Sequence, residues 1–431
     1  MHRKAFLAKR LTQTAILVSI SLFSVSCGKK SPSPSPVNQE QPIQVPGSQQ
    51  PEVRDDLPTA GFYNNADGSP IFALLNGAKT SLDIEIYQMA DADVRAAIRN
   101  ALARKIKVRV VKEPAPLGDD CNVFTPIEAK EDPTCADQKK LRAEIIEQGG
   151  HYVPFNKDNL CANPARPCFE HGKMVIADQK AVLISTGNFN SSNLCNLKQN
   201  PGKCNRDFTV IQRKSEIVSL LSKVFENDLK GEKYNLRKIL MEEGAKDQVT
   251  VSPFSLDPLV DFVKSAAVSI RIQNQYLKEP NLNQALIEAA RRGVHVEITV
   301  ASVCSFGPPS AREAESQRAL FGSFIDAGFS VRLLPSAFKI NGKPGYLHSK
   351  AIVIDDRKAW VGSVNGSSSA TSNNREFGTF FEEPAWVASL AGILKADHES
   401  PDTETLEESL ACKKDRNSSG ESGGDGDGNV R

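Results

Sequence analysis

The sequence repeats one unit, a strand followed by a helix and a second strand. The first copy covers residues 81–86, 94–104 and 108–111, and the second covers 269–273, 282–292 and 294–300. The copies share residues at one constant offset without a gap: Ala101 with Ala289, Arg104 with Arg292, and Val108 with Val296. A duplicated unit of this size predicts two halves with the same local architecture.

Strand-helix-strand order places the two strands parallel, with the helix covering one face of the sheet. Each half continues with another helix and strand, around 141–153 and 320–334. A chain of 431 residues is long enough for two domains of ordinary size. We therefore predict an α/β fold of two similar halves, 57–244 and 245–412, each a central mixed sheet flanked by helices and related by a pseudo-twofold axis.

Each half also contains one His-x-Lys motif, followed at identical spacing by an Asn. The motif residues are His171, Lys173 and Asn188 in the first half and His348, Lys350 and Asn365 in the second. Side chains two residues apart on a strand share a face, so the His and the Lys project together from one edge of the sheet.

The apolar run after each His-x-Lys motif ends in turn residues, which begin at Asp178 and Asp355. Folding the segment back there as a hairpin places the Asn of each half opposite its His. Each half is then expected to present an imidazole, an ammonium group and an amide in one cluster.

Such a cluster suits a phosphodiester. Lys and Asn can hold the non-bridging oxygens, while His can act as nucleophile or proton donor near neutral pH. A displacement through a covalent intermediate needs two imidazoles, one to attack phosphorus and one to protonate the leaving oxygen. Two copies in one chain meet that need if the halves face each other across one shared site.

The duplicated pattern resembles the HKD signature of the phospholipase D superfamily, and the likeness extends from about Gly61 to Leu394. The resemblance implies a phosphodiesterase that needs no metal or other cofactor and forms a phosphohistidine intermediate. It also implies a carboxylate that orients each His, for which Asp207 and Glu376 are the candidates. By the same resemblance His171 is the nucleophile and His348 the general acid.

The first half departs from this pattern at three positions. Ser185 replaces the Gly of the motif, Thr186 replaces its Ser, and Asp207 is shorter than Glu and follows Asn188 at a longer distance. Because the His, Lys and Asn all remain, we expect activity to be retained. A binding protein that has lost catalysis is the alternative, and the presence of both His-x-Lys motifs argues against it.

Other polar residues have simpler interpretations. His151, His295 and His398 are predicted to be structural. Arg206 and Arg375 lie in matching Asn-Arg-acid-Phe segments and can bind phosphate or form ion pairs. Glu85 and Gln273 occupy equivalent strand positions, where they can line the cleft or lie at a polar edge.

Residues 1–27 have the features of a bacterial export signal, with basic residues before an apolar stretch. The stretch ends in Ser-Val-Ser-Cys, which resembles a lipobox and predicts lipidation of Cys27; cleavage that yields a simple secreted protein is the alternative. Residues 28–56 are rich in Ser, Pro and Gln and are predicted to be a disordered tether, and 413–431 a disordered tail.

Cysteine usage agrees with export, because eight of the nine Cys remain once Cys27 is set aside. Their spacing does not match a zinc site, so disulfides are favoured over metal binding. The local pairs Cys161 with Cys168 and Cys195 with Cys204 are the expected bridges.

The motif predicts the reaction type but leaves the substrate open. Export and a lipid anchor, on the periplasmic or outer-membrane face, favour a phospholipid membrane as substrate. Lys plus Arg number 53 and Asp plus Glu 52, so no overall basic field favours nucleic acid. We expect a monomeric phospholipid hydrolase, with an exported nuclease or a cardiolipin-synthase-like transphosphatidylase as alternatives.

Overall fold

The computed structural model describes residues 56–65, 69–118 and 121–414. The predicted export signal with Cys27, nearly all of the predicted tether and residues 415–431 lie outside this part of the chain. Within it, no helix combines the length and apolar character needed to span a membrane.

The first half contains a seven-stranded sheet. In spatial order its strands are β1 (Gly61–Asn64), β7 (Phe208–Gln212), β6 (Ala181–Ser185), β5 (Lys173–Ala177), β2 (Ser81–Ile86), β3 (Lys107–Lys112) and β4 (His151–Pro154). β2, β3 and β4 are parallel, and the remaining strands pair antiparallel.

The second half repeats this topology. In the order that matches the first sheet, its strands are β8 (Val249–Val251), β16 (Phe377–Phe381), β15 (Lys358–Gly362), β14 (Ala351–Ile354), β9 (Ser269–Asn274), β10 (His295–Ala301) and β11 (Ser330–Leu334). A two-stranded ribbon, β12 (Lys339–Ile340) and β13 (Lys343–Pro344), lies before the second motif. Two mixed sheets with the same strand order confirm the predicted fold class.

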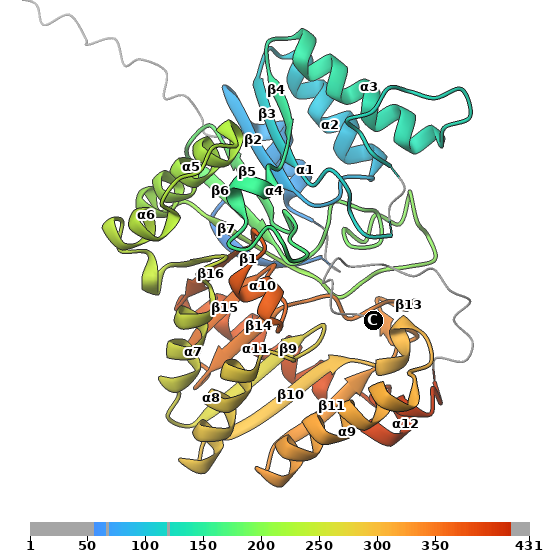
Figure 1. The fold of residues 1–431 in the computed structure, drawn as a ribbon, viewed down its shortest axis with the longest axis vertical. Helices are drawn as coiled ribbons and strands as arrows, with labels where there is room; N and C mark the ends of the chain where they lie inside the picture. The colour runs from blue at the N-terminus through green and yellow to red at the C-terminus, as the bar shows by residue number, and fades with distance from the viewer. Residues whose placement is uncertain (1–55, 66–68, 119–120, 415–431) are drawn as a thin grey trace, which may run out of the picture. The chain divides into compact units, whose positions relative to one another are not determined.

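Helices cover both faces of each sheet (Figure 1). In the first half they are α1 (Ile71–Gly77), α2 (Ala92–Ala103), α3 (Pro133–Glu147), α4 (Lys157–Leu160), α5 (Ser215–Lys230) and α6 (Leu236–Glu242). In the second half they are α7 (Leu256–Lys264), α8 (Pro280–Arg291), α9 (Ala311–Asp326), α10 (Ser368–Ser372), α11 (Pro384–His398) and α12 (Leu406–Leu410). Short 3-10 helices occur at Ala245–Asp247 and Val303–Phe306.

The helix starts follow from local sequence. The side chain of Asp91 accepts hydrogen bonds from two backbone N–H groups at the start of α2, and Asp132 does the same for α3. Ser310 and Glu313 form a reciprocal capping box that starts α9. These caps fix where each helix begins, and therefore which apolar face it turns toward the sheet.

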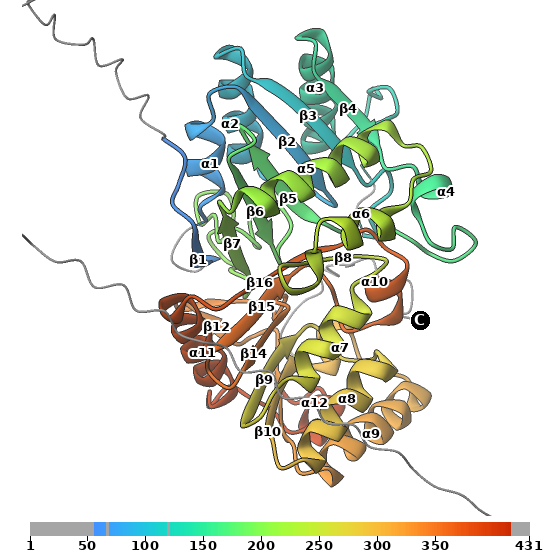
Figure 2. The ribbon, with the colours of Figure 1, turned by 90° about the vertical axis from the view of Figure 1, so that its left-hand side faces the viewer.

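Each sheet is the centre of a three-layer core. Apolar residues of α1, α2 and α3 pack on one face of the first sheet, and residues of α5 and α6 pack on the other (Figures 1 and 2). In the second half α7, α8 and α9 cover one face and α11 covers the other. The α5 core also includes Phe377 of β16, and the α11 core includes Phe208 of β7, so the halves share apolar packing.

The motif aspartates lie in the hairpin turns of the two sheets. Asp178 and Asp355 both have positive φ, 55° and 53°, which short polar side chains tolerate. The Asp178 carboxylate accepts hydrogen bonds from the backbone N–H groups of residues 79–81, and Asp355 accepts them from 267–269. Against the effect of burial, these amides hold the pKa of Asp178 below its ordinary value. Each aspartate thus ties its turn to the start of the neighbouring strand, β2 for Asp178 and β9 for Asp355.

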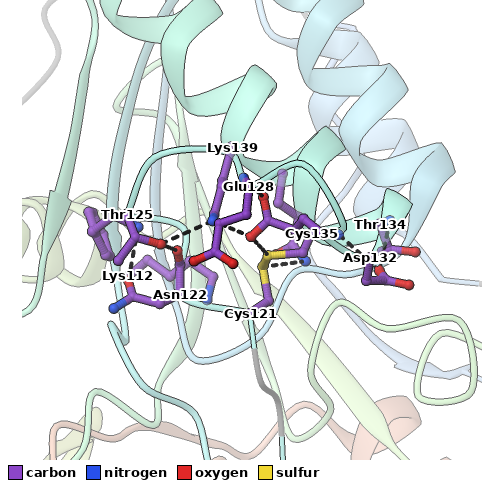
Figure 3. Close-up of a disulfide and its surroundings, with 12 residues drawn as sticks. Lys112, Cys121, Asn122, Thr125, Glu128, Asp132, Thr134, Cys135 and Lys139 are labelled. Carbon is purple, nitrogen blue, oxygen red and sulfur yellow. Dashed lines mark hydrogen bonds and ion pairs between the residues drawn. A yellow bond between two sulfur atoms is a disulfide. The ribbon is translucent and has the colours of Figure 1, made fainter.

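Four disulfides join the eight Cys of the described part of the chain. They are Cys121–Cys135, Cys161–Cys168, Cys195–Cys204 and Cys304–Cys412, so the two expected local bridges are confirmed. Figure 3 shows Cys121–Cys135, which ties the loop after β3 to the first turn of α3. Nearby, the Lys139 ammonium donates to Thr125 Oγ1 at 3.0 Å, which fixes the same loop a second time.

We predict that Asp178→Ala lowers the free energy of unfolding by about 1–3 kcal/mol, because several backbone N–H groups lose their acceptor. Gln179→Ala is the comparison variant, since Gln179 has nearly the same φ, 54°, in the same turn and its side chain donates one hydrogen bond, to Asp83 Oδ2 at 2.9 Å. Urea unfolding of both variants is the measurement. Equal losses would show that the strained turn, rather than the carboxylate, sets the effect.

Candidate active site

The site residues gather at one edge of each sheet. In the first half β2 and β6 end at this edge, and β5 begins there with Lys173. The second half repeats this with β9, β15 and β14, and Lys350 directly precedes β14. All six His, Lys and Asn side chains of the two motifs are buried, at 0–1% exposure. The interior of the protein therefore holds them in place.

The His-to-Asn register differs from the expected one. β5 pairs with β6 so that Met174 faces Ile184 and Ala177 faces Ala181. Continued to the sheet edge, this register sets Gly187 opposite His171, one residue before Asn188. The amide of Asn188 instead donates to Gln88 Oε1 at 3.1 Å, in the segment that follows β2.

Each imidazole is bonded to a carboxylate from the other half. His171 Nδ1 lies 2.9 Å from Glu376 Oε1, and His348 Nδ1 lies 2.7 Å from Asp207 Oδ1. Both carboxylates are fully buried. An Nδ1–H that donates to a carboxylate leaves Nε2 to face a substrate and fixes the tautomer. The two motif sets are therefore parts of one arrangement.

Backbone hydrogen bonds also connect each His to the opposite half. The N–H of His171 donates to the carbonyl of Arg375 at 2.9 Å, and the N–H of His348 donates to the carbonyl of Arg206 at 3.1 Å. The Asn-Arg-acid-Phe segment of each half thus runs beside the His of the other half, as an isolated bridge at each place.

The two arginines of these segments form buried ion pairs. Arg375 lies 2.8 Å from Asp228 of α5, and Arg206 lies 2.8 Å from Asp397 of α11. Each Arg therefore anchors its segment to a helix of the opposite half. Of the two interpretations open from sequence, the structure shows ion pairing at both positions.

Further polar groups hold the carboxylates, a role that the sequence pattern did not assign to them. Asp207 accepts a hydrogen bond from Thr186 Oγ1 at 2.7 Å and another from Asn193 Nδ2 at 2.9 Å. Glu376 receives equivalent contacts from Ser363 and Asn374. Asn193 lies two residues before Cys195 of the Cys195–Cys204 disulfide and carries no motif signal. Thr186 and Ser363 were visible as motif positions.

Tyr87 covers the first imidazole. Its ring lies 4.8 Å from that of His171, edge to face, and its hydroxyl accepts a hydrogen bond from the Leu117 N–H at 2.6 Å. The Lys173 ammonium lies 5.3 Å from the centre of the same ring. The sequence offered one signal that Tyr87 belongs to the site. Tyr87 directly follows a predicted parallel strand, and binding residues collect at the ends of such strands.

The electrostatics of the site are unusual at Glu376. Burial raises the pKa of Glu376 to about 8, against the opposing charge of Lys173. The pair formed by His171 and Glu376 consequently holds an additional proton at neutral pH.

The other three histidines of the described residues lie apart from these contacts. His151 and His295 are exposed, and His398 is buried with hydrogen-bond contacts to Thr299 and Ser330. Within the described residues no group of three or more His, Cys, Asp and Glu side chains is arranged to hold a metal ion.

The comparisons with known proteins place this arrangement in a family. The model described as "cardiolipin synthase, PLD-like domain" matches residues 71–229 and 259–397, one segment in each half. The chain belongs to this family of the phospholipase D superfamily, whose members act on phosphodiesters. No curated protein sequence matches the chain.

Two solved structures share the fold over most of this chain. Phosphatidylserine synthase of Haemophilus influenzae Rd KW20 aligns over 80% of this chain and 87% of its own, with 16% identity and a TM-score of 0.56. Polyphosphate kinase from Porphyromonas gingivalis aligns over 79% of this chain and 51% of its own, with 14% identity and a TM-score of 0.51. The phospholipase D family member Nuc from Salmonella typhimurium covers 35% of this chain and 91% of its own, with 23% identity and a TM-score of 0.30.

Asn365 provides a test of the site. Among the described residues, neither its amide nitrogen nor its amide oxygen has a hydrogen-bond partner, although the side chain is fully buried. A buried polar group in this state costs about 1–3 kcal/mol. Such a group is explained if a substrate's phosphate oxygens complete its hydrogen bonding.

We predict that Asn365→Leu raises the free energy of unfolding by about 1–3 kcal/mol and abolishes catalysis. Asn373→Leu is the control, because Asn373 is also buried but has hydrogen bonds to Asn163 and Pro167, so its loss destabilises the protein. Denaturant unfolding and activity are measured together. Destabilisation by both substitutions would contradict a substrate role for Asn365.

Proposed function

We propose that this protein is a phosphodiesterase of the phospholipase D type that hydrolyses phospholipid head groups through a phosphohistidine intermediate. The observation that carries the proposal is the pair of buried imidazoles, each with its Nδ1 held by a carboxylate of the opposite half. One Nε2 can attack phosphorus while the other protonates the leaving oxygen. The ammonium groups of Lys173 and Lys350 supply positive charge for the phosphoryl oxygens.

Several observations support a lipid substrate. The matching family is described as cardiolipin synthase, and a fold neighbour is a phosphatidylserine synthase. The predicted export signal and lipidated Cys27 would hold the protein at a membrane, on the periplasmic or outer-membrane face. The nearly equal numbers of basic and acidic residues disfavour a polynucleotide track. The protein is proposed to act as a monomer, since both halves contribute to one site.

Transfer to an alcohol is the second candidate, and the family description favours it. The same intermediate yields free phosphatidate with water and a new phosphodiester with an alcohol. Glycerol or phosphatidylglycerol in the assay therefore distinguishes a hydrolase from a transferase by product.

The substrate test uses the full chain in detergent, with disulfides intact and EDTA present. We expect head-group release from mixed phospholipid vesicles, no cleavage of single- or double-stranded DNA, and loss of turnover by at least about 10³-fold in His171→Ala with phospholipid. DNA cleavage without lipid turnover would overturn the lipid proposal, and full activity of His171→Ala would overturn the shared site.

A further inference from the structure

The two imidazoles lie in different electrostatic surroundings despite their matching contacts. The halves differ at buried positions beside the site, among them two that carry a carboxyl group in the first half only. Glu85 of β2 corresponds to Gln273 of β9, and Glu170, which precedes His171, corresponds to Leu347. All four side chains are fully buried. The first half therefore contains two carboxyl groups that the second half lacks.

Glu170 is held close to the first motif. Its Oε1 accepts the Gly172 N–H at 2.8 Å, and its own N–H donates to Glu113 Oε2 at 2.9 Å. Burial, together with the carboxylates of Glu113 and Glu376, raises the pKa of Glu170 well above its ordinary value. Its Oε2 is buried and has no hydrogen-bond partner among the described residues. The group is a further proton-binding site, and its pKa is raised in part by the charge of Glu376.

Glu85 continues the same acidic cluster toward α5. Burial, followed by the charges of Asp228 and Glu170, raises the pKa of Glu85 well above its ordinary value. Cations oppose these shifts: Arg375 pairs with Asp228 and also acts on Glu85, Lys157 lies 2.7 Å from Glu113, and Lys173 acts on Glu170 and Glu376. Burial nevertheless keeps the pKa of Glu85 and of Glu170 raised. A crowded set of buried acids retains protons to higher pH than an isolated acid does.

The second half has neutral groups at these positions. Gln273 donates to Asp397 Oδ2 at 2.9 Å and accepts from Ser349 Oγ at 2.6 Å, so its amide is satisfied without a proton. The Lys350 ammonium lies 3.1 Å from His348 Nε2. An ammonium can only donate a hydrogen bond, so this contact requires a lone pair on Nε2.

We propose that His348 is the nucleophile and His171 the proton donor, and that Glu170 and Glu85 are positioning residues that keep the proton on the His171 side. This assignment reverses the one that the family resemblance implies, and it rests on the proposed phosphodiesterase function. Its basis is the acidic cluster around the first motif and the Lys350 contact at Nε2 of His348.

The chemical steps balance without a further reagent. The Nε2 lone pair of His348 forms a bond to phosphorus, and the bond from phosphorus to the leaving oxygen breaks. That oxygen takes its proton from His171 Nε2 and departs as an alcohol. Water then attacks phosphorus, gives a proton to His171, and the phosphorus–nitrogen bond returns its electron pair to His348.

The first test separates the two roles by leaving group. The full chain and its His171→Ala and His348→Ala variants are given a phospholipid and bis(p-nitrophenyl) phosphate, whose leaving group needs no proton. We expect His171→Ala to lose at least about 10³-fold on phospholipid yet release p-nitrophenolate in a first turnover. Mass spectrometry of the quenched protein should then find the phosphoryl group on His348, whereas His348→Ala releases nothing.

The opposite result, with release by His348→Ala and the phosphoryl group on His171, overturns the role assignment alone. Loss of release in both variants while the wild type reacts also overturns it. A wild-type protein that cleaves neither compound overturns the phosphodiesterase proposal itself.

A second measurement does not depend on removing either imidazole. Activity of the wild type on phospholipid should fall as pH rises through about 8, where the proton held by His171 and Glu376 is lost. Glu170→Gln, and Glu85→Gln, which recreates the Gln of the second half, should move that falling limb to lower pH by about one unit. Movement of the rising limb instead would show that His171 must lose a proton to act, and would contradict the proposal.

Discussion

The exchange of one short segment between the halves is the constraint on which the site depends. Each Asn-Arg-acid-Phe segment lies beside the His of the opposite half, accepts its backbone N–H, and supplies the carboxylate for its Nδ1. The same segment sends its Arg to a helix of that half, Arg375 to α5 and Arg206 to α11. Neither half can therefore supply the carboxylate that its own His needs at Nδ1. A duplicated fold with reciprocal contacts of this kind produces one site per chain.

Burying the His–carboxylate pairs costs desolvation free energy, and each carboxylate therefore accepts several hydrogen bonds. The free-energy cost of removing two charges from water is offset only when their remaining polar atoms also form hydrogen bonds. Asp207 meets that condition through Thr186 and Asn193, and Glu376 through Ser363 and Asn374. The segment that carries Asn193 leads directly into the Cys195–Cys204 disulfide. The unpartnered amide of Asn365 and the carboxyls of Glu85 and Glu170 depart from this rule, and they lie beside the groups assigned to chemistry.

Much of the architecture was predictable because it is encoded locally. The strand-helix-strand pattern occurs twice in the sequence. Each copy is followed by a His-x-Lys motif at the same edge of its sheet. The crossed pairing was not predictable, since His171 and Glu376 are 205 residues apart and no local pattern links them. The position of Asn188 depends on a register that a turn can shift by one residue. Glu85 alternates with apolar neighbours as an edge residue would, and only the packing of α5 shows that it is buried.

The crossed pairing is tested most directly by nuclear magnetic resonance of the full chain labelled with 15N-histidine. A hydrogen-bonded Nδ1 proton gives a signal whose shift depends on its carboxylate acceptor. The account predicts that Glu376→Gln moves the His171 signal and leaves that of His348, while Asp207→Asn does the reverse. If each substitution instead moves the signal of the His in its own half, the halves do not exchange carboxylates and the account is wrong.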